Sequence, residues 1–235
     1  MRGKADAMRL YELAGADPAL VFSPFCWRSR YALAAKGLQA ETVPWRFVQK
    51  DAIAPHGAEK VPVLLHEGRA IHDSWAIAEY LEQRFPDRPS LFGGEAGRAT
   101  ARFVNAWADA VVLAGIARLI VADIAEVLDP GDVEYFRTSR AARFGMPLEQ
   151  VQADRDRAVA GFRQALHPLR MTLRAQPFLG GAAPLYPDAI VMGCFQWARC
   201  TSPFRLLEPD DPIEAWRQRM LDPHGGFARR VPAFD

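Results

Sequence analysis

The sequence predicts a small α/β domain followed by a larger all-helical domain. Between residues 8 and 85, short β-like segments alternate with helical ones. The stretch Phe85–Gly94 is rich in Pro and Gly, as linkers are, and the hydrophobic pattern after it is helical throughout. We therefore expect a first domain at 1–85, a linker at 86–95 and a helical domain at 96–235.

Six segments are expected in the first domain, in a β-α-β, then β-β-α order. Alternating apolar residues mark the strands, and apolar residues at helical spacing mark the helices. Gly37 stops the first helix, and Glu67-Gly68-Arg69 makes a tight hairpin turn. In order, the segments are a strand at Leu10–Leu13, a helix at Pro24–Lys36, a strand at Glu41–Val48, a loop at Gln49–Glu59, a hairpin of Val63–His66 and Ala70–Ile71, and a helix at Ser74–Arg84.

The second domain is expected to contain two long helices and two shorter ones. The long helices are predicted near Ala96–Val127 and Pro147–Arg174. Between them, Asp129–Gly145 is expected to be a loop with helical turns. The shorter helices are predicted near Pro187–Ala198 and Pro212–Met220.

Composition and charge indicate a soluble globular protein. The net charge of +1 and the absence of a basic stripe argue against a nucleic-acid partner. Cys26, Cys194 and Cys200 form neither a disulfide framework nor a zinc pattern, so we expect no metal and a reducing compartment. Met1–Ala7 lacks the apolar region of a signal peptide, and no apolar run, Ala108–Val121 included, approaches the ~20 residues of a membrane helix. We expect a cytoplasmic protein that does not enter membranes.

Ser23 is the first candidate for chemistry. It precedes Pro24 at the start of a predicted helix, and capping of that helix would by itself explain a serine there. Alternatively, its hydroxyl donates to a bound thiolate, which the positive end of the helix dipole also favours. A free thiol has a pKa of about 8.5, and we expect these two effects to lower it by about one to two units.

Cys26 lies three residues after Ser23, in a Ser-x-x-Cys arrangement. The first thiol of a redox Cys-x-x-Cys pair is therefore missing. We expect Cys26 to be buried and inert, while a glutaredoxin-like reductase that uses this thiol remains the alternative.

Two further motifs point to a peptide ligand. Val61-Pro62 precedes a predicted strand, and it is either a plain strand start or a place where the backbone of Val61 stays free to pair with an extended peptide. The proline peptide bond there is a candidate for the cis form. Asp73-Ser74 opens a helix, and it is either a cap or a binding place for an α-amino-acid head.

In the order and spacing of these residues, the chain resembles the glutathione transferases from about Met8 to Ala233. The resemblance implies a thioredoxin-like N-terminal domain that binds glutathione and an all-helical domain that lines the electrophile site. It implies that Ser23 is catalytic, that Val61-Pro62 pairs with the cysteinyl part of glutathione, and that Asp73-Ser74 holds its γ-glutamyl end. Lys60 stands where some classes bind the glycyl carboxylate. Glutathione is then a co-substrate, and a homodimer is expected.

Within this family the chain is most similar to the bacterial β-etherase type. The similarity lies in Phe22–Leu38 and Tyr186–Leu221, and its most specific parts are Phe195–Arg199 and Asp210–Arg217. It implies that glutathione displaces the oxygen of an aryl ether beside a ketone. In one respect the chain departs from many transferases: Leu185 replaces the Ser or Thr that caps the helix near Asp188, which predicts a weaker helix start.

The acceptor is expected to be a small aromatic electrophile. Apolar and aromatic side chains should line its pocket, and Phe25, Trp107 and Tyr186 are the candidates. Packing in the core is the alternative for each of them. Besides the reductase, a carrier that binds glutathione or an apolar compound without catalysis remains a second alternative function.

Overall fold

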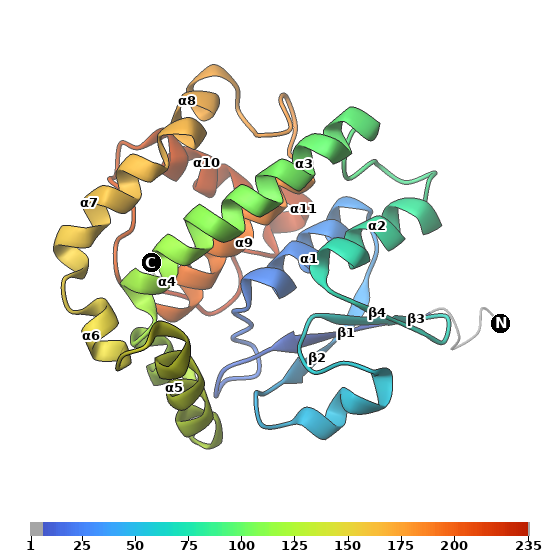
Figure 1. The fold of residues 1–235 in the computed structure, drawn as a ribbon. Helices are drawn as coiled ribbons and strands as arrows, with labels where there is room; N and C mark the ends of the chain where they lie inside the picture. The colour runs from blue at the N-terminus through green and yellow to red at the C-terminus, as the bar shows by residue number, and fades with distance from the viewer. Residues whose placement is uncertain (1–6, 235) are drawn as a thin grey trace.

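The computed structural model, which describes residues 7–234, places a mixed sheet with two helices against a bundle of helices (Figure 1). Strand β1 (Met8–Leu13) pairs in parallel with β2 (Ala40–Trp45) and antiparallel with β3 (Val63–His66). Strand β3 forms a hairpin with β4 (Arg69–His72), so the order in the sheet is β2-β1-β3-β4. This confirms the predicted thioredoxin-like fold of the first part of the chain.

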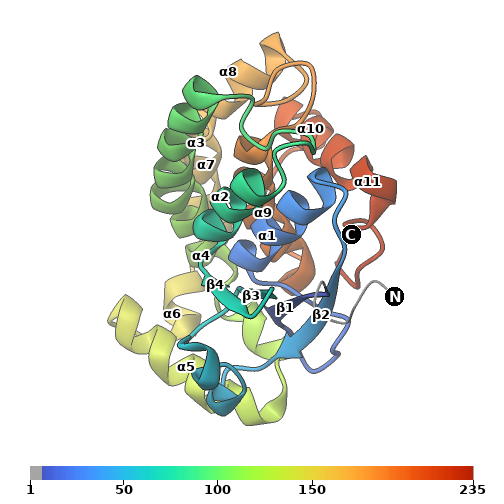
Figure 2. The ribbon, with the colours of Figure 1, turned by 90° about the vertical axis from the view of Figure 1, so that its right-hand side faces the viewer.

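Helices α1 (Pro24–Ala35) and α2 (Ser74–Arg84) lie between the sheet and the helical part of the molecule (Figure 2). Two 3-10 turns, Lys50–Ala52 and Ala54–His56, lie on the opposite side of the sheet (Figure 1). The layers are held together by fully buried apolar side chains, among them Leu10, Trp27, Trp45, Leu64 and Ile77. The starts of α1 and α2 therefore both face the boundary with the helical bundle.

Helix α9 is the central element of the bundle. Almost all of its side chains are buried, because α1, α3, α4 and α10 all pack around it. The elements of this part are α3 (Glu95–Trp107), the π-helical turn η4 (Ala108–Leu113), α4 (Ala114–Ile120), the 3-10 turn η5 (Asp123–Val127), α5 (Pro130–Phe144), α6 (Leu148–Gln152), α7 (Arg155–Ala165), α8 (His167–Ala175), α9 (Tyr186–Thr201), α10 (Pro212–Leu221) and α11 (Pro223–Gly226).

The prediction of a loop at Asp129–Gly145 is wrong, because α5 occupies this segment. Its apolar stripe is short, and Phe136 is the apolar side chain that it buries, so hydrophobic periodicity did not reveal it. The ends of the helix carry clearer signals. The Asp129 carboxylate accepts from the N–H of Gly131 at 3.0 Å, and Gly145 ends the helix at a φ of 73°.

Both long helices predicted in the bundle are interrupted. The first contains the π-helical turn η4, in which the backbone widens for six residues, and its regular part ends at Ile120. The second is divided into α6, α7 and α8. Its second break falls at Leu166, two residues before Pro168, whose ring and missing N–H disfavour a continuous helix.

Asp188 makes the start of α9 stronger than its sequence predicts. Its buried carboxylate accepts from the N–H groups of Leu179, Gly180 and Leu185 at 2.8 to 3.0 Å, and from the Trp216 indole at 2.9 Å. Burial raises the pKa of Asp188, and these four donors oppose that rise. A side chain inside the helix therefore replaces the missing Ser or Thr cap.

Charged residues interrupt the run Glu95–Ile120, which joins α3, η4 and α4. Within residues 7–234 it is nevertheless the one helical run that is long and apolar enough to span a membrane by length and composition, with 26 residues and a mean hydropathy of 1.6 in its most apolar 18-residue window. One side of it packs on α9, yet only 28% of its most apolar window is buried. The bundle thus leaves an apolar helix face uncovered.

Candidate functional site

Ser23 lies at the N-terminus of α1, where its hydroxyl accepts from the N–H of Cys26 at 3.4 Å. The residue is 5% exposed. Within residues 7–234, no oxygen or nitrogen accepts the proton of this hydroxyl, and its remaining side-chain partner is the Cys26 thiol, a weak acceptor. The capping role is therefore real, and the hydroxyl still has a proton to donate to a ligand beside a helix N-terminus.

Cys26 is a buried thiol, as the sequence predicted. Burial raises its pKa to about 12, and the negative charge of the nearby Glu12 contributes to the rise. A thiol with this pKa is protonated at neutral pH and is a poor nucleophile. This result argues against the reductase alternative.

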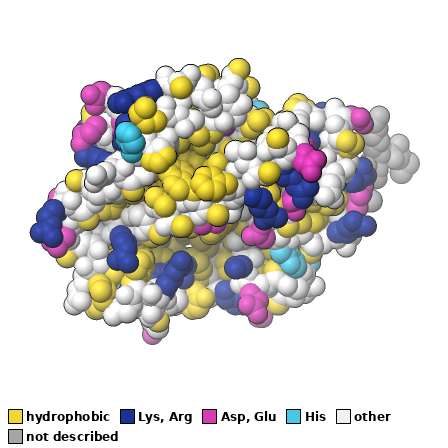
Figure 3. Space-filling model, turned by 45° about the horizontal axis from the view of Figure 1, so that its top comes forward, with side chains coloured by type: hydrophobic (Ala, Val, Ile, Leu, Met, Phe, Trp, Pro, Cys, Tyr) yellow, Lys and Arg dark blue, Asp and Glu magenta, His cyan; other side chains and the backbone are white. Residues whose placement is uncertain are grey.

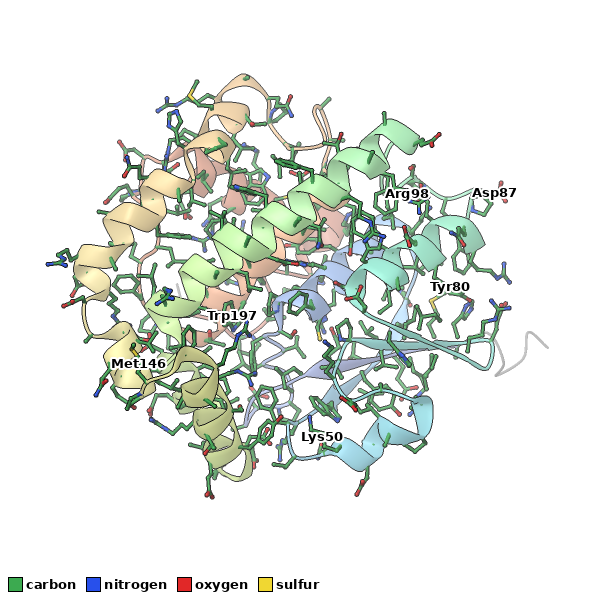
Figure 4. The ribbon with its side chains drawn as sticks, viewed as in Figure 1. Lys50, Tyr80, Asp87, Arg98, Met146 and Trp197 are labelled. Carbon is green, nitrogen blue, oxygen red and sulfur yellow. The ribbon has the colours of Figure 1, made fainter. Side chains whose placement is uncertain are left out.

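The peptide bond between Val61 and Pro62 is cis. Val61 is half-buried, and its N–H and C=O form no hydrogen bond within the described part of the chain. Two lysines lie beside it: Lys60 is exposed, and Lys50 donates to the carbonyl of Glu59 at 3.1 Å (Figure 4). Lys50 could not be selected from the sequence, because only the fold brings it to Glu59, two residues before Val61.

Asp73 and Ser74 open α2. One oxygen of Asp73 accepts from the N–H groups of Trp75 and Ala76 at 2.8 and 3.3 Å, while the other oxygen of this exposed side chain makes no hydrogen bond within residues 7–234. Ser74 is buried, and its hydroxyl makes no hydrogen bond among the residues described. A carboxylate oxygen, a hydroxyl and helix N–H groups thus meet at one point.

For Tyr186 the structure favours the alternative of packing in the core over contact with an acceptor beside Ser23. Its side chain is 1% exposed between the rings of Trp75 and Phe92, and its hydroxyl donates to the carbonyl of Ser74 at 2.8 Å. A ring enclosed in this way cannot contact a substrate. Tyr186 instead ties α9 to the start of α2.

Phe25 and Trp107 are not brought together either. Phe25 is half-buried on α1, which meets α3 and η4 through Asn105 and Asp109. Trp107 is two positions from each of these residues, so it lies on about the opposite side of its helix. Phe25 therefore lies beside the Arg28 contact between α1 and η4, whereas Trp107 points away from α1.

Trp197 is an aromatic side chain near the start of α1 that sequence reasoning did not select. Gly193 of α9 packs so closely on α1 that a Cβ there would lie 2.5 Å from the carbonyl oxygen of Pro24. Trp197 is one turn further along the same face of α9. Figure 4 shows it between α4, α5 and the start of α1, and it is only half-buried.

Comparisons with known proteins agree with this arrangement. The family model "Glutathione S-transferase, N-terminal domain" matches residues 19–89, and "Glutathione S-transferase, C-terminal domain" matches residues 99–216. A probable glutathione S-transferase from Oryza sativa subsp. indica, GSTU1, is 40% identical over 100 residues. That match covers 38% of this chain and 42% of the rice protein, which is less than half of its length.

Solved structures match over almost the whole chain. The glutathione transferase GSTFuA3 from Phanerochaete chrysosporium has a TM-score of 0.75 and 26% identity, covering 95% of this chain and 93% of its own. CsGST63524 of Ceriporiopsis subvermispora, solved in complex with glutathione, has a TM-score of 0.75 and 24% identity, covering 96% and 94%. The structural similarity to this protein supports the assignment of the fold. With family models matched on both parts of the chain, the protein belongs to the glutathione transferase family.

Proposed function

We propose that the protein is an enzyme that binds glutathione across the starts of α1 and α2 and transfers its sulfur to an electrophilic carbon. The observation that carries the proposal is the Ser23 hydroxyl, which caps α1 and has only the weakly accepting Cys26 thiol as a partner for its proton. The thiol loses its proton to solvent, and Ser23 and the helix N-terminus stabilise the thiolate. A carbon–sulfur bond then forms, and the leaving group departs with the electron pair of the bond that breaks.

Three parts of the site match three parts of glutathione. The free backbone groups of Val61 suit the cysteinyl amide, by strand-like pairing. The hydroxyl of Ser74 and the first N–H groups of α2 suit the γ-glutamyl carboxylate, while the second oxygen of Asp73 suits its ammonium. Lys60, with Lys50 beside it, supplies the positive charge for the glycyl carboxylate.

For the acceptor we propose a flat aromatic electrophile. Phe25 and Trp197 are half-buried aromatic side chains near Ser23, and such rings favour an aromatic ligand. The resemblance of Phe195–Arg199 and Asp210–Arg217 to β-etherases supports a finer proposal, an aryl ether beside a ketone. In that reaction the thiolate attacks the carbon that bears the ether oxygen, and a phenolate leaves.

The proposal is tested by incubating the protein with glutathione and two sets of acceptors, β-aryl ether ketones and aryl halides. We expect mass spectrometry to detect glutathione thioethers, and a free phenol in equal amount from the ethers. Thioethers from aryl halides alone would remove the ether proposal and leave the transferase function. Glutathione binding without any thioether would instead support the non-catalytic carrier.

We also propose that the protein is a homodimer that uses the apolar face of Glu95–Ile120. Phe103 lies on this face and is 73% exposed. The helix lies at the outside of the molecule (Figure 2), and hydrophobic side chains gather across the middle of the surface shown in Figure 3. An exposed apolar patch of this kind commonly marks an interface.

Replacing Phe103 by serine should therefore shift the protein from dimer to monomer, because the interface would lose a large apolar contact. Analytical ultracentrifugation over a concentration series measures the shift. Met171→Ser on α8 is the matched control, since Met171 is also apolar and exposed, at 49%. A wild-type monomer, or a Phe103→Ser variant as dimeric as the control, would contradict the proposed interface.

A further inference from the structure

Arg28 is a buried cation at the boundary between α1 and the helical bundle. Its side chain is 1% exposed, and all three guanidinium nitrogens have partners. Nη2 lies 2.7 Å from the Asp109 carboxylate, Nη1 donates to the amide oxygen of Asn105 at 3.2 Å, and Nε donates to the carbonyl of Ile190 at 3.3 Å. One side chain of α1 thus holds both α3–η4 and α9.

The partners of Arg28 form a small network of their own. The amide of Asn105 donates to the second oxygen of Asp109 at 3.1 Å, so both carboxylate oxygens are engaged. Asp109 belongs to the π-helical turn η4, and π-helical turns often occur at functional sites. Its side chain is 38% exposed, so this end of the network reaches the surface.

Arg28 also connects the separate parts of the proposed site. Its guanidinium carbon lies 4.7 Å from the centre of the Phe25 ring, on the acceptor side. Burial raises the pKa of the Tyr186 hydroxyl, and the positive charge of Arg28 opposes that rise. Tyr186 in turn donates to Ser74 on the γ-glutamyl side. A change at Arg28 can therefore move Phe25 and the helical wall relative to α1.

We propose that Arg28 and Asp109 are positioning residues for the acceptor half of the site. The inference rests on the proposed function. Arg28 is too buried to touch a ligand, so it acts through Phe25 and through the wall formed by α3 and η4. The glutathione contacts proposed for Val61, Asp73 and Ser74 lie on the sheet and α2. Only the indirect path through Tyr186 links Ser74 to Arg28, so these glutathione contacts should be much less sensitive to the Arg28–Asp109 pair.

The test compares two ligands that fill different parts of the site. Glutathione fills one half, and S-(2,4-dinitrophenyl)glutathione fills both. Arg28→Lys keeps the positive charge but loses the planar fork, and Asp109→Asn keeps the shape but loses the charge. For both variants we expect the Kd of the conjugate to rise about tenfold, a typical size for a lost charged contact, and that of glutathione to rise less than about threefold. In the double variant the Kd of the conjugate should rise no further than in the more affected single variant, because both substitutions act on the same interaction.

Arg170→Lys is the matched control. Arg170 forms a similarly buried pair with Asp211, at 2.7 Å, between α8 and α10. The Arg170→Lys variant should have a lower melting temperature than the wild type, while the ratio of the Kd of the conjugate to the Kd of glutathione stays unchanged. The positioning role would be overturned if Arg28→Lys left the ratio of the two Kd values unchanged, or if Arg170→Lys changed that ratio equally. If the wild type binds the conjugate but forms no thioether, the proposed function fails and the Kd ratio still decides the inference. Wild type that binds neither ligand would overturn both.

Discussion

Replacing Ser23 by alanine should raise the pKa of the bound glutathione thiol by about one unit, because the thiolate loses its hydroxyl donor but keeps the helix N-terminus. One unit corresponds to about 1.4 kcal/mol of lost preference for the charged form. At a pH below the thiol pKa of both forms, the thiolate population and kcat/KM should therefore fall by a factor of roughly ten. The ultraviolet absorbance of the thiolate, followed against pH in the complex, measures the shift directly.

Two variants separate this effect from helix capping. Ser23→Thr keeps a hydroxyl that can both cap α1 and donate, so it should retain most of the pKa depression. Ser29→Ala removes another buried hydroxyl of α1, one that donates to the carbonyl of Phe25 at 3.4 Å. It should leave the thiol pKa unchanged. An unshifted thiol pKa in Ser23→Ala would show that Ser23 is a cap and nothing more.

Local signals in the sequence were sufficient to predict most of the fold. The helix at Ser74–Arg84 has the predicted ends, because Asp73 caps it and the apolar spacing is regular. Helix α5 was missed because it buries little apolar surface, although the caps Asp129 and Gly145 marked both of its ends. The widening of the helix at Ala108–Leu113 had no local signal in the sequence; this turn packs against α9, and its Asp109 contacts Arg28 of α1.

The candidate site was predictable where its residues lie at the ends of helices and strands. Ser23, Val61-Pro62 and Asp73-Ser74 are such positions, and their capping or strand-start chemistry can be recognised locally. The exposure of aromatic side chains on the helices was not predictable in this way. Tyr186 begins α9 and Trp197 lies within it, and only the packing around that helix decides that Tyr186 is enclosed and Trp197 is half-open.

Glu12 should make the folded protein less stable as the pH rises from about 5 to 8. It lies on β1 with 0% exposure, and burial raises its pKa from 4.5 to about 7. The Arg30 guanidinium, with its Nε 2.8 Å from the carboxylate, opposes the rise but does not cancel it. Between these two pKa values the folded state holds a proton that the unfolded chain has lost. Stability therefore declines over this interval, by roughly 3 kcal/mol for a shift of this size.

Glu12→Gln removes this titration and keeps the shape of the side chain. Its free energy of unfolding, measured by urea denaturation from pH 5 to 8, should rise relative to that of the wild type by about 3 kcal/mol across the range. Glu82→Gln is the control. Burial would raise the pKa of Glu82, but the N–H of Leu91 and the Lys36 ammonium outweigh it and lower that pKa. The stability that Glu82 contributes is complete above pH 4.5, so the control's difference from the wild type should stay constant from pH 5 to 8.

If the free energy of unfolding of Glu12→Gln also differed from that of the wild type by a constant amount from pH 5 to 8, Glu12 would be ionised throughout this range and fully compensated by Arg30. The two outcomes also have different consequences for the thiol site. Glu12 lies close enough to Cys26 to raise the pKa of that thiol, and Cys26 follows Ser23 within the first turn of α1. A carboxyl that is neutral below pH 7 leaves the positive end of the helix unopposed, whereas an ionised one places a negative charge beneath it. The pH profile of Glu12→Gln therefore also shows whether the helix end that we propose for the thiolate carries a buried opposing charge.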